Sequence, residues 1–96
     1  MSPKNKIKLN LLRKKLDKLD NQILKLIKKW SIIVEKVLSL KNYKKEIIDK
    51  KRILTILKKI RKESIKRNMD PKITHKIWKN MILTYIDFEK RNFKKK

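Results

Sequence analysis

Apolar residues recur along the first part of the chain at steps that alternate between four and three residues. They are Leu12, Leu16, Leu19, Ile23, Leu26, Trp30, Ile33, Val37 and Leu40, and we call them the seam. This heptad spacing is typical of one long helix with a continuous apolar stripe. We expect the helix to begin near residues 9–10 and to end at about Leu40, a length on the order of 45 Å.

A second, shorter helical pattern follows a connection at residues 42–48, where the heptad spacing is lost. Asp49 is a suitable N-cap, because its carboxylate accepts hydrogen bonds from free backbone N–H groups of the first turn. Apolar residues then lie at helical spacing from Ile53 to Ile60, and less regularly at Ile65.

Residues 67–69 interrupt this pattern, and a third helix follows. Asp70 supplies an acceptor at its N-cap and Pro71 occupies its first position. The apolar spacing continues to about Phe93, and no strand alternation is present. The sequence therefore predicts an all-α fold with three helices per chain, one long and two shorter.

The length of the seam bears on assembly and on domain boundaries. Two short helices cannot cover a seam of this length, so we expect a second copy of the chain to pack along it as a homodimer. Residues 1–8 are polar and are expected to be a disordered, frayed tail. Residues 9–93 then form one helical domain, and residues 94–96 form a basic tail.

Composition excludes several kinds of chemistry. The chain has no Cys and a single His, which excludes disulfides, thiolate chemistry and Cys- or His-based metal clusters. No apolar run is long enough to cross a membrane, and the start does not resemble a signal peptide. We expect a cytoplasmic protein that uses no metal.

The formal net charge of +22 suggests a nucleic-acid partner at first sight. However, Lys, Ile and Asn together supply half of the residues, and Ala and Gly are absent. These three residue types have A- and T-rich codons, so the bias resembles drift at tolerant surface positions. The lysines are also spread along the whole chain without interleaved aromatic residues. We therefore expect nucleic acid not to be the partner.

A few polar residues stand at positions where they could act together. Arg13 lies at the start of the seam, Lys41 follows its end, and Arg52 lies in the first turn of the second helix. Glu89 follows Tyr85 by one turn of the third helix. Cations that converge on a helical interface would suit a small dicarboxylate.

The order and spacing of these residues carry a resemblance to a known family over about residues 9–90. The matching positions are Leu12-Arg13-x-x-Leu16-Asp17-x-Leu19-Asp20-x-x-Ile23-Leu24-x-Leu26-Ile27, Val34-x-x-Val37-x-x-x-Lys41, Ile48-Asp49-x-x-Arg52, Met69-Asp70-Pro71 and Ile77-Trp78-x-x-Met81-Ile82-x-x-Tyr85-Ile86-x-x-Glu89. In these positions the chain resembles the all-helical chorismate mutases, which are intertwined dimers of three-helix chains. The resemblance implies conversion of chorismate to prephenate, for phenylalanine and tyrosine biosynthesis.

The resemblance also implies roles for individual residues. Arg13 would enter the partner subunit's site and pair with a substrate carboxylate, while Lys41 would contact a carboxylate and the ether oxygen of the breaking bond. Glu89 would be the second group on that oxygen, which requires it to be protonated. Asp49 and Arg52 would lie near the ring hydroxyl, and Tyr85 would complete the substrate-binding residues. From the residues alone, Asp49 is also a helix cap and Tyr85 a core residue.

Two positions depart from the family pattern. The family has an arginine where this chain has Trp30, and the mutases have a Glu where it has Ile53. Ile53, together with Tyr85-Ile86, is similar to the related isochorismate–pyruvate lyases. Three hypotheses therefore stay open: a chorismate mutase with possible loss of activity, a lyase on the same fold, and a non-catalytic basic helical dimer that binds nucleic acid or a partner protein.

The implied reaction is compatible with the residues available. The rearrangement of chorismate is unimolecular and requires no nucleophile, metal or cofactor. The protein has to hold a dianion in its reactive conformation and stabilise negative charge on the ether oxygen. Arginine suits bidentate carboxylate binding, and lysine suits a single contact to an oxygen. We therefore expect an isomerase that uses no cofactor.

Overall fold

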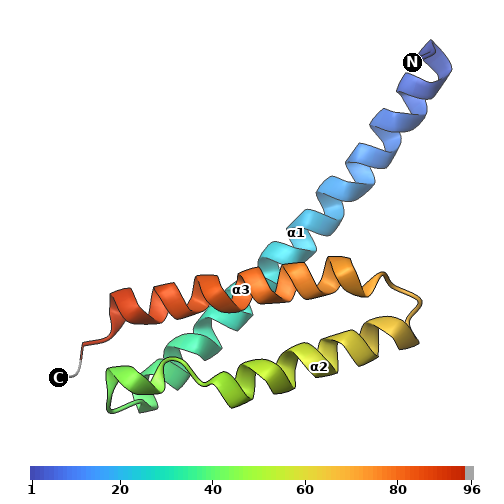
Figure 1. The fold of residues 1–96 in the computed structure, drawn as a ribbon. Coiled ribbons are helices and arrows are strands. Elements are labelled where there is room, and N and C mark those ends of the chain that lie inside the picture. Colours follow the sequence, from blue (N-terminus) through green and yellow to red (C-terminus); the bar gives the residue numbers. More distant parts are fainter. Residues whose placement is uncertain (95–96) are drawn as a thin grey trace. The chain divides into compact units, whose positions relative to one another are not determined.

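A computed structural model describes residues 1–94 of the chain. The elements are α1 (Pro3–Leu40), a short 3₁₀ helix η1 (Lys44–Glu46), α2 (Lys50–Lys66) and α3 (Pro71–Asn92) (Figure 1). No strand occurs among the described residues. The prediction of an all-α fold with one long and two shorter helices is confirmed.

Helix α1 begins earlier than the sequence predicted. Ser2 caps it: the backbone N–H of Asn5 donates to Ser2 Oγ at 3.2 Å, and that of Lys6 donates to the Ser2 carbonyl at 2.9 Å. Pro3 then takes the first helical position, which suits a residue without an N–H group. The expected start at residues 9–10 is therefore wrong, and so is the disordered tail expected at residues 1–8. The same capping chemistry that identified the third helix was present here in Ser2-Pro3.

The opposite end of the chain agrees more closely with expectation. Helix α3 ends at Asn92, and Phe93 is its C-cap in extended conformation. Lys94 lies beyond the helix, and the rest of the expected basic tail at residues 94–96 falls outside the described residues.

The chain divides into two compact units, Met1–Ile33 and Val34–Lys96, and each is described by itself. The first unit is helical from Pro3 onward. Its seam residues, from Leu12 to Ile33, each leave between 37% and 63% of their surface exposed in the single chain. A helix with an uncovered apolar stripe of this length gains little stability from packing within its own unit.

The second unit contains the helical hairpin of α2 and α3, which pack side by side (Figure 1). Their facing sides are half-buried and include Ile53, Ile56, Leu57, Ile60, Trp78, Met81, Ile82, Tyr85 and Ile86. Leu38 and Ile47 are the only buried apolar residues among those described. The core of this unit is thin, as the length of the chain leads one to expect.

The connection between α1 and α2 is held by one carboxylate. Glu46 Oε1 accepts hydrogen bonds from the backbone N–H groups of Asn42, at 3.2 Å, and Tyr43, at 2.9 Å. Ile47, which follows at once, is only 3% exposed and anchors the connection. The predicted connection at residues 42–48 is confirmed, and Glu46 Oε1 helps to maintain it.

The turn between α2 and α3 matches the predicted break at residues 67–69. Asn68 has a φ of 55°, a left-handed conformation that Asn tolerates better than most residues. The backbone N–H of Met69 donates to the Ser64 carbonyl at 2.9 Å, and that of Asn68 donates to the Ile65 carbonyl at 3.1 Å. This pattern of bonds satisfies the last carbonyls of α2 and stops the helix.

Both predicted N-caps are confirmed. Asp49 Oδ1 accepts from the backbone N–H of Arg52 at 3.0 Å at the start of α2. Asp70 Oδ1 accepts from the backbone N–H of Lys72 at 2.9 Å at the start of α3, where Pro71 is the first helical residue. Local chemistry thus defines where each of these helices begins.

A buried pair of hydroxyl groups joins α2 to α3. Ser64 and Thr74 are 3% and 4% exposed, and their side-chain oxygens are 2.7 Å apart. Ser64 Oγ also donates to the Ile60 carbonyl at 2.6 Å, so Thr74 Oγ1 is the donor to Ser64 when that bond forms. The pair fixes the register of the two helices near their connecting turn.

We expect Ser64→Ala to lower the free energy of unfolding by about 1–2 kcal/mol, because the buried Thr74 hydroxyl loses its short partner. Its remaining contact, to the Pro71 carbonyl, is 3.4 Å long. Urea unfolding followed by circular dichroism measures the change. Thr55→Ala is the matched control, since the exposed Thr55 hydroxyl bonds only its own helix, at the Lys51 carbonyl. Equal losses in both variants would contradict the role of the buried pair.

Candidate active site

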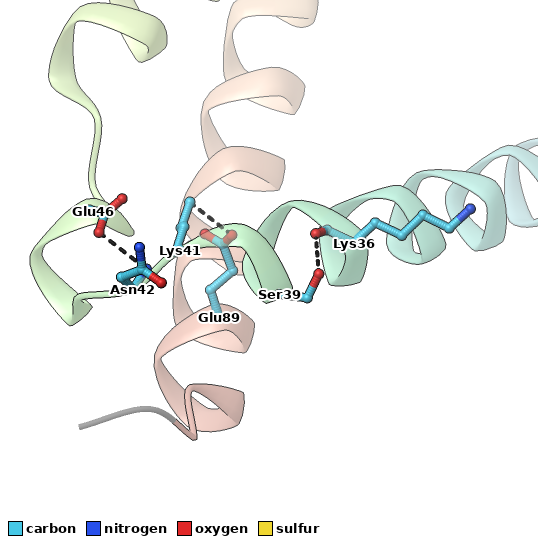
Figure 2. Close-up of polar contacts among 6 residues, drawn as sticks. All are labelled: Lys36, Ser39, Lys41, Asn42, Glu46 and Glu89. Carbon is cyan, nitrogen blue, oxygen red and sulfur yellow. Dashed lines mark hydrogen bonds and ion pairs between the residues drawn. The ribbon is translucent and has the colours of Figure 1, made fainter.

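Lys41 and Glu89 form an ion pair within the second unit. Lys41 directly follows the last residue of α1, where its backbone N–H donates to the Leu38 carbonyl at 3.1 Å. Its Nζ lies 3.0 Å from Glu89 Oε1 on α3, as Figure 2 shows. The two side chains are 18% and 7% exposed. The structure therefore brings together the two residues expected to be catalytic, which are far apart in the sequence.

Glu89 is the one buried acidic residue in the described part of the chain. Burial of a carboxylate is unfavourable unless a cation or hydrogen-bond donors compensate for its lost hydration. Lys41 supplies both a charge and a donor, and it is itself only slightly exposed. Replacement of either residue by an uncharged one would therefore leave the charge of the other residue without its ion-pair partner.

An open hollow of about 800 Å³ lies beside Lys41. Its lining consists of Lys41, Glu46, Ile48, Asp49, Lys50 and Lys51. A volume of this order is sufficient for a small organic ligand. Two of the residues predicted from the sequence, Lys41 and Asp49, thus face the same space.

Lys50 and Lys51 were missed by the sequence reasoning. Both lie in the first turn of α2, which has no acidic residue, and both line the hollow. Cations are disfavoured at the N-terminus of a helix, because the backbone N–H groups there already carry partial positive charge. The run Lys50-Lys51-Arg52 directly after a cap was therefore an unusual feature that could have drawn attention to them.

The remaining predicted residues are placed less closely around the hollow. Arg52 is exposed and is not among the residues that line it. Tyr85 is half-buried, and its ring meets that of Phe88 edge to face with centroids 6.5 Å apart. Arg13 is exposed and belongs to the first unit. Within one chain, the structure pairs Lys41 with Glu89 and places Asp49 in the lining of the same hollow as Lys41. The catalytic and binding roles of all six residues stay predictions.

Within residues 1–94, no three His, Cys, Asp or Glu side chains come together in a way that would hold a metal ion. None of the helices among these residues combines the length and the apolar character that a membrane span requires.

The fold and the site define a small all-helical protein with a buried Lys–Glu pair beside an open, lysine-lined hollow. A family model described as chorismate mutase type II matches residues 12–90, which is most of the chain. The chain belongs to the chorismate mutase type II family. Searches among curated proteins and among solved structures found no match.

Proposed function

We propose that this protein is a chorismate mutase that rearranges chorismate to prephenate for phenylalanine and tyrosine biosynthesis. The observation that carries the proposal is the Lys41–Glu89 pair, at 3.0 Å, beside the hollow in a chain that matches the family over residues 12–90. A cation and a carboxyl group held next to each other can both reach one oxygen atom of a ligand.

In this proposal the protein accelerates the reaction by binding and by electrostatic stabilisation. Lys41 donates to the ether oxygen, on which negative charge grows as the carbon–oxygen bond breaks. Glu89 in its protonated form donates to the same oxygen. The substrate is held in its compact conformation, so that the two reacting carbon atoms stay close. The net charge of +22 also attracts a dianion, an effect that salt screens.

We further propose that two chains pair along the seam and that Arg13 of each chain completes the site of the other. The exposed seam supports this assembly, because a second copy would bury apolar surface that the first unit leaves uncovered. The exposed guanidinium of Arg13 would pair with a substrate carboxylate in a bidentate manner. Two equivalent sites per dimer follow from two-fold symmetry.

Two residues favour a reduced rate. Trp30 stands where the resemblance implies a cation, and half-buried Ile53 stands where it implies a carboxylate for the substrate hydroxyl. Asp49 is the carboxylate nearest in sequence to Ile53 that lines the hollow, and we propose that it contacts the ring hydroxyl together with Arg52.

The purified protein tests the proposal directly. Incubation with chorismate should yield prephenate, which is measured by the loss of chorismate absorbance. Release of pyruvate from isochorismate, without prephenate formation, would instead identify a lyase on the same fold. Failure of both reactions, with nucleic-acid binding that falls steeply with salt, would support the non-catalytic alternative.

We expect Glu89→Gln to keep most of the wild-type turnover number and Glu89→Ala to lose most of it. The amide N–H of Gln can donate to the ether oxygen, whereas Ala leaves neither a donor nor a partner for Lys41. Initial rates at saturating chorismate measure the turnover number of each variant. Equal turnover numbers for the two variants would contradict this role of Glu89.

A further inference from the structure

The hollow beside Lys41 is lined by more basic than acidic side chains. Its lining includes three lysines, Lys41, Lys50 and Lys51, and two acidic residues, Glu46 and Asp49. The question is which of these charges are already engaged within the protein. Charged side chains that have no partner within the protein are available to bind a ligand of opposite charge.

Both carboxylates have structural partners. Glu46 Oε1 accepts from two backbone N–H groups of the connection, at 2.9 and 3.2 Å. Asp49 Oδ1 accepts from the backbone N–H of Arg52 at 3.0 Å and caps α2. No ion pair within the described residues joins either carboxylate to a lysine of the hollow. These two acids hold the backbone around the hollow, and their carboxylate oxygens lie outside ion-pair distance of its lysines.

Of the three lysines, Lys41 is engaged with Glu89. Lys50 and Lys51 are exposed, and neither forms an ion pair with any described residue. Their ammonium groups are the two charges of this wall that have no ion-pair partner among the described residues. Water and mobile anions compensate for them in the free protein, and both can be displaced by a ligand.

We propose that Lys50 and Lys51 together bind one carboxylate of the dianionic substrate in this hollow. The inference rests on the proposed function and extends it. A dicarboxylate needs two cationic contacts besides the group that acts on its ether oxygen, and Lys41 serves that oxygen. Arg13 of the partner subunit contacts one carboxylate, and the Lys50–Lys51 pair contacts the other. The two lysines are therefore substrate-binding residues, whose loss raises KM more than it lowers kcat.

The test compares two double variants of α2. Lys50→Gln/Lys51→Gln removes the two charges at the hollow. Lys58→Gln/Lys59→Gln is the matched control, because it removes two adjacent, exposed lysines of the same helix that do not line the hollow. Both variants have the same net charge, so they separate a local contact from the general attraction of an anion. Circular dichroism shows whether each variant keeps its helices.

We expect KM for chorismate to rise about tenfold in the first variant and less than twofold in the control, since an exposed charge-assisted contact is at the weak end of its range. The rise of KM with added salt should also become shallower in the first variant only. Equal KM values for the two variants would overturn the inference while leaving the mutase function intact.

Product binding supplies a second, independent measurement. Titration calorimetry with prephenate should give a higher dissociation constant for Lys50→Gln/Lys51→Gln than for the control. The ratio of the two dissociation constants should match the ratio of the two KM values. A wild-type protein that neither converts chorismate nor binds prephenate would overturn the proposed function, and this inference with it. If the two double variants converted chorismate at different rates but bound prephenate with equal affinity, a direct contact of the two lysines to the carboxylate would be contradicted.

Discussion

Lys41→Ala is expected to lower kcat for chorismate by about 10²- to 10³-fold, the usual effect of removing one donor that stabilises charge in a transition state. In the structure Lys41 Nζ is held 3.0 Å from Glu89, which fixes its position before any ligand enters. The donor is thus preorganised, and the protein has little reorganisation left to perform during the reaction. Initial rates over a range of chorismate concentrations measure kcat separately from KM.

Two further variants keep this result interpretable. Lys41→Gln retains a donor for the buried Glu89 carboxylate, so its loss of rate does not arise from a buried carboxylate that lacks a hydrogen-bond donor. Lys36→Ala removes an exposed lysine near the same end of α1 and is expected to behave like the wild type (Figure 2). If all three variants turned over chorismate at similar rates, Lys41 would not be the catalytic group.

Mixing two inactive chains is expected to restore activity. If Arg13 completes the site of the other chain, Arg13→Ala and Lys41→Ala should each be inactive as homodimers, whereas a hybrid dimer would contain one site with neither substitution. Random reassociation makes half of the dimers hybrid, so an equal mixture unfolded and refolded together should recover about a quarter of the wild-type rate. Recovery that fails to exceed the sum of the two separate proteins would show that the site is not shared between chains.

A mixture of the double variant with the wild-type chain gives an independent measurement of whether the site is shared. Here a chain with both substitutions is refolded with an equal amount of wild-type chain. If Arg13 acts in the partner's site, both sites of each hybrid dimer are inactivated. The mixture should retain about a quarter of the wild-type rate if Arg13 acts in the partner's site, and about half if it acts in its own. Size-exclusion chromatography of each mixture confirms that the dimers have formed.

The sequence predicted the starts of α2 and α3 well, because an aspartate side chain caps each of them. Asp49 and Asp70 each accept from a backbone N–H of the first turn, and both interactions are between residues close in sequence. The start of α1 was missed because the polar segment after Ser2 lacks the apolar spacing that identified the other helices. Capping and apolar periodicity are separate signals, and there the first was present without the second.

The candidate site was predictable in part. The pairing of Lys41 with Glu89 depends on how residue 41 lies against α3 within the second unit, and local patterns do not specify this. The family resemblance supplied both residues. Lys50 and Lys51 were hidden among 31 basic residues, since each looks like any other exposed lysine. Their place in the first turn of α2 and the hollow that they line distinguish them from the other lysines of α2.

The uncovered seam of the first unit also determines how long the chain would survive digestion. Lys and Arg make up 31 of the 96 residues, so peptide bonds that a trypsin-like protease can cut occur along the whole length. A regular helix resists cutting only while it stays folded, because a protease binds an extended segment. Burial of Leu12 to Ile33 against a second copy would therefore protect the first unit from degradation, and dilution would remove that protection.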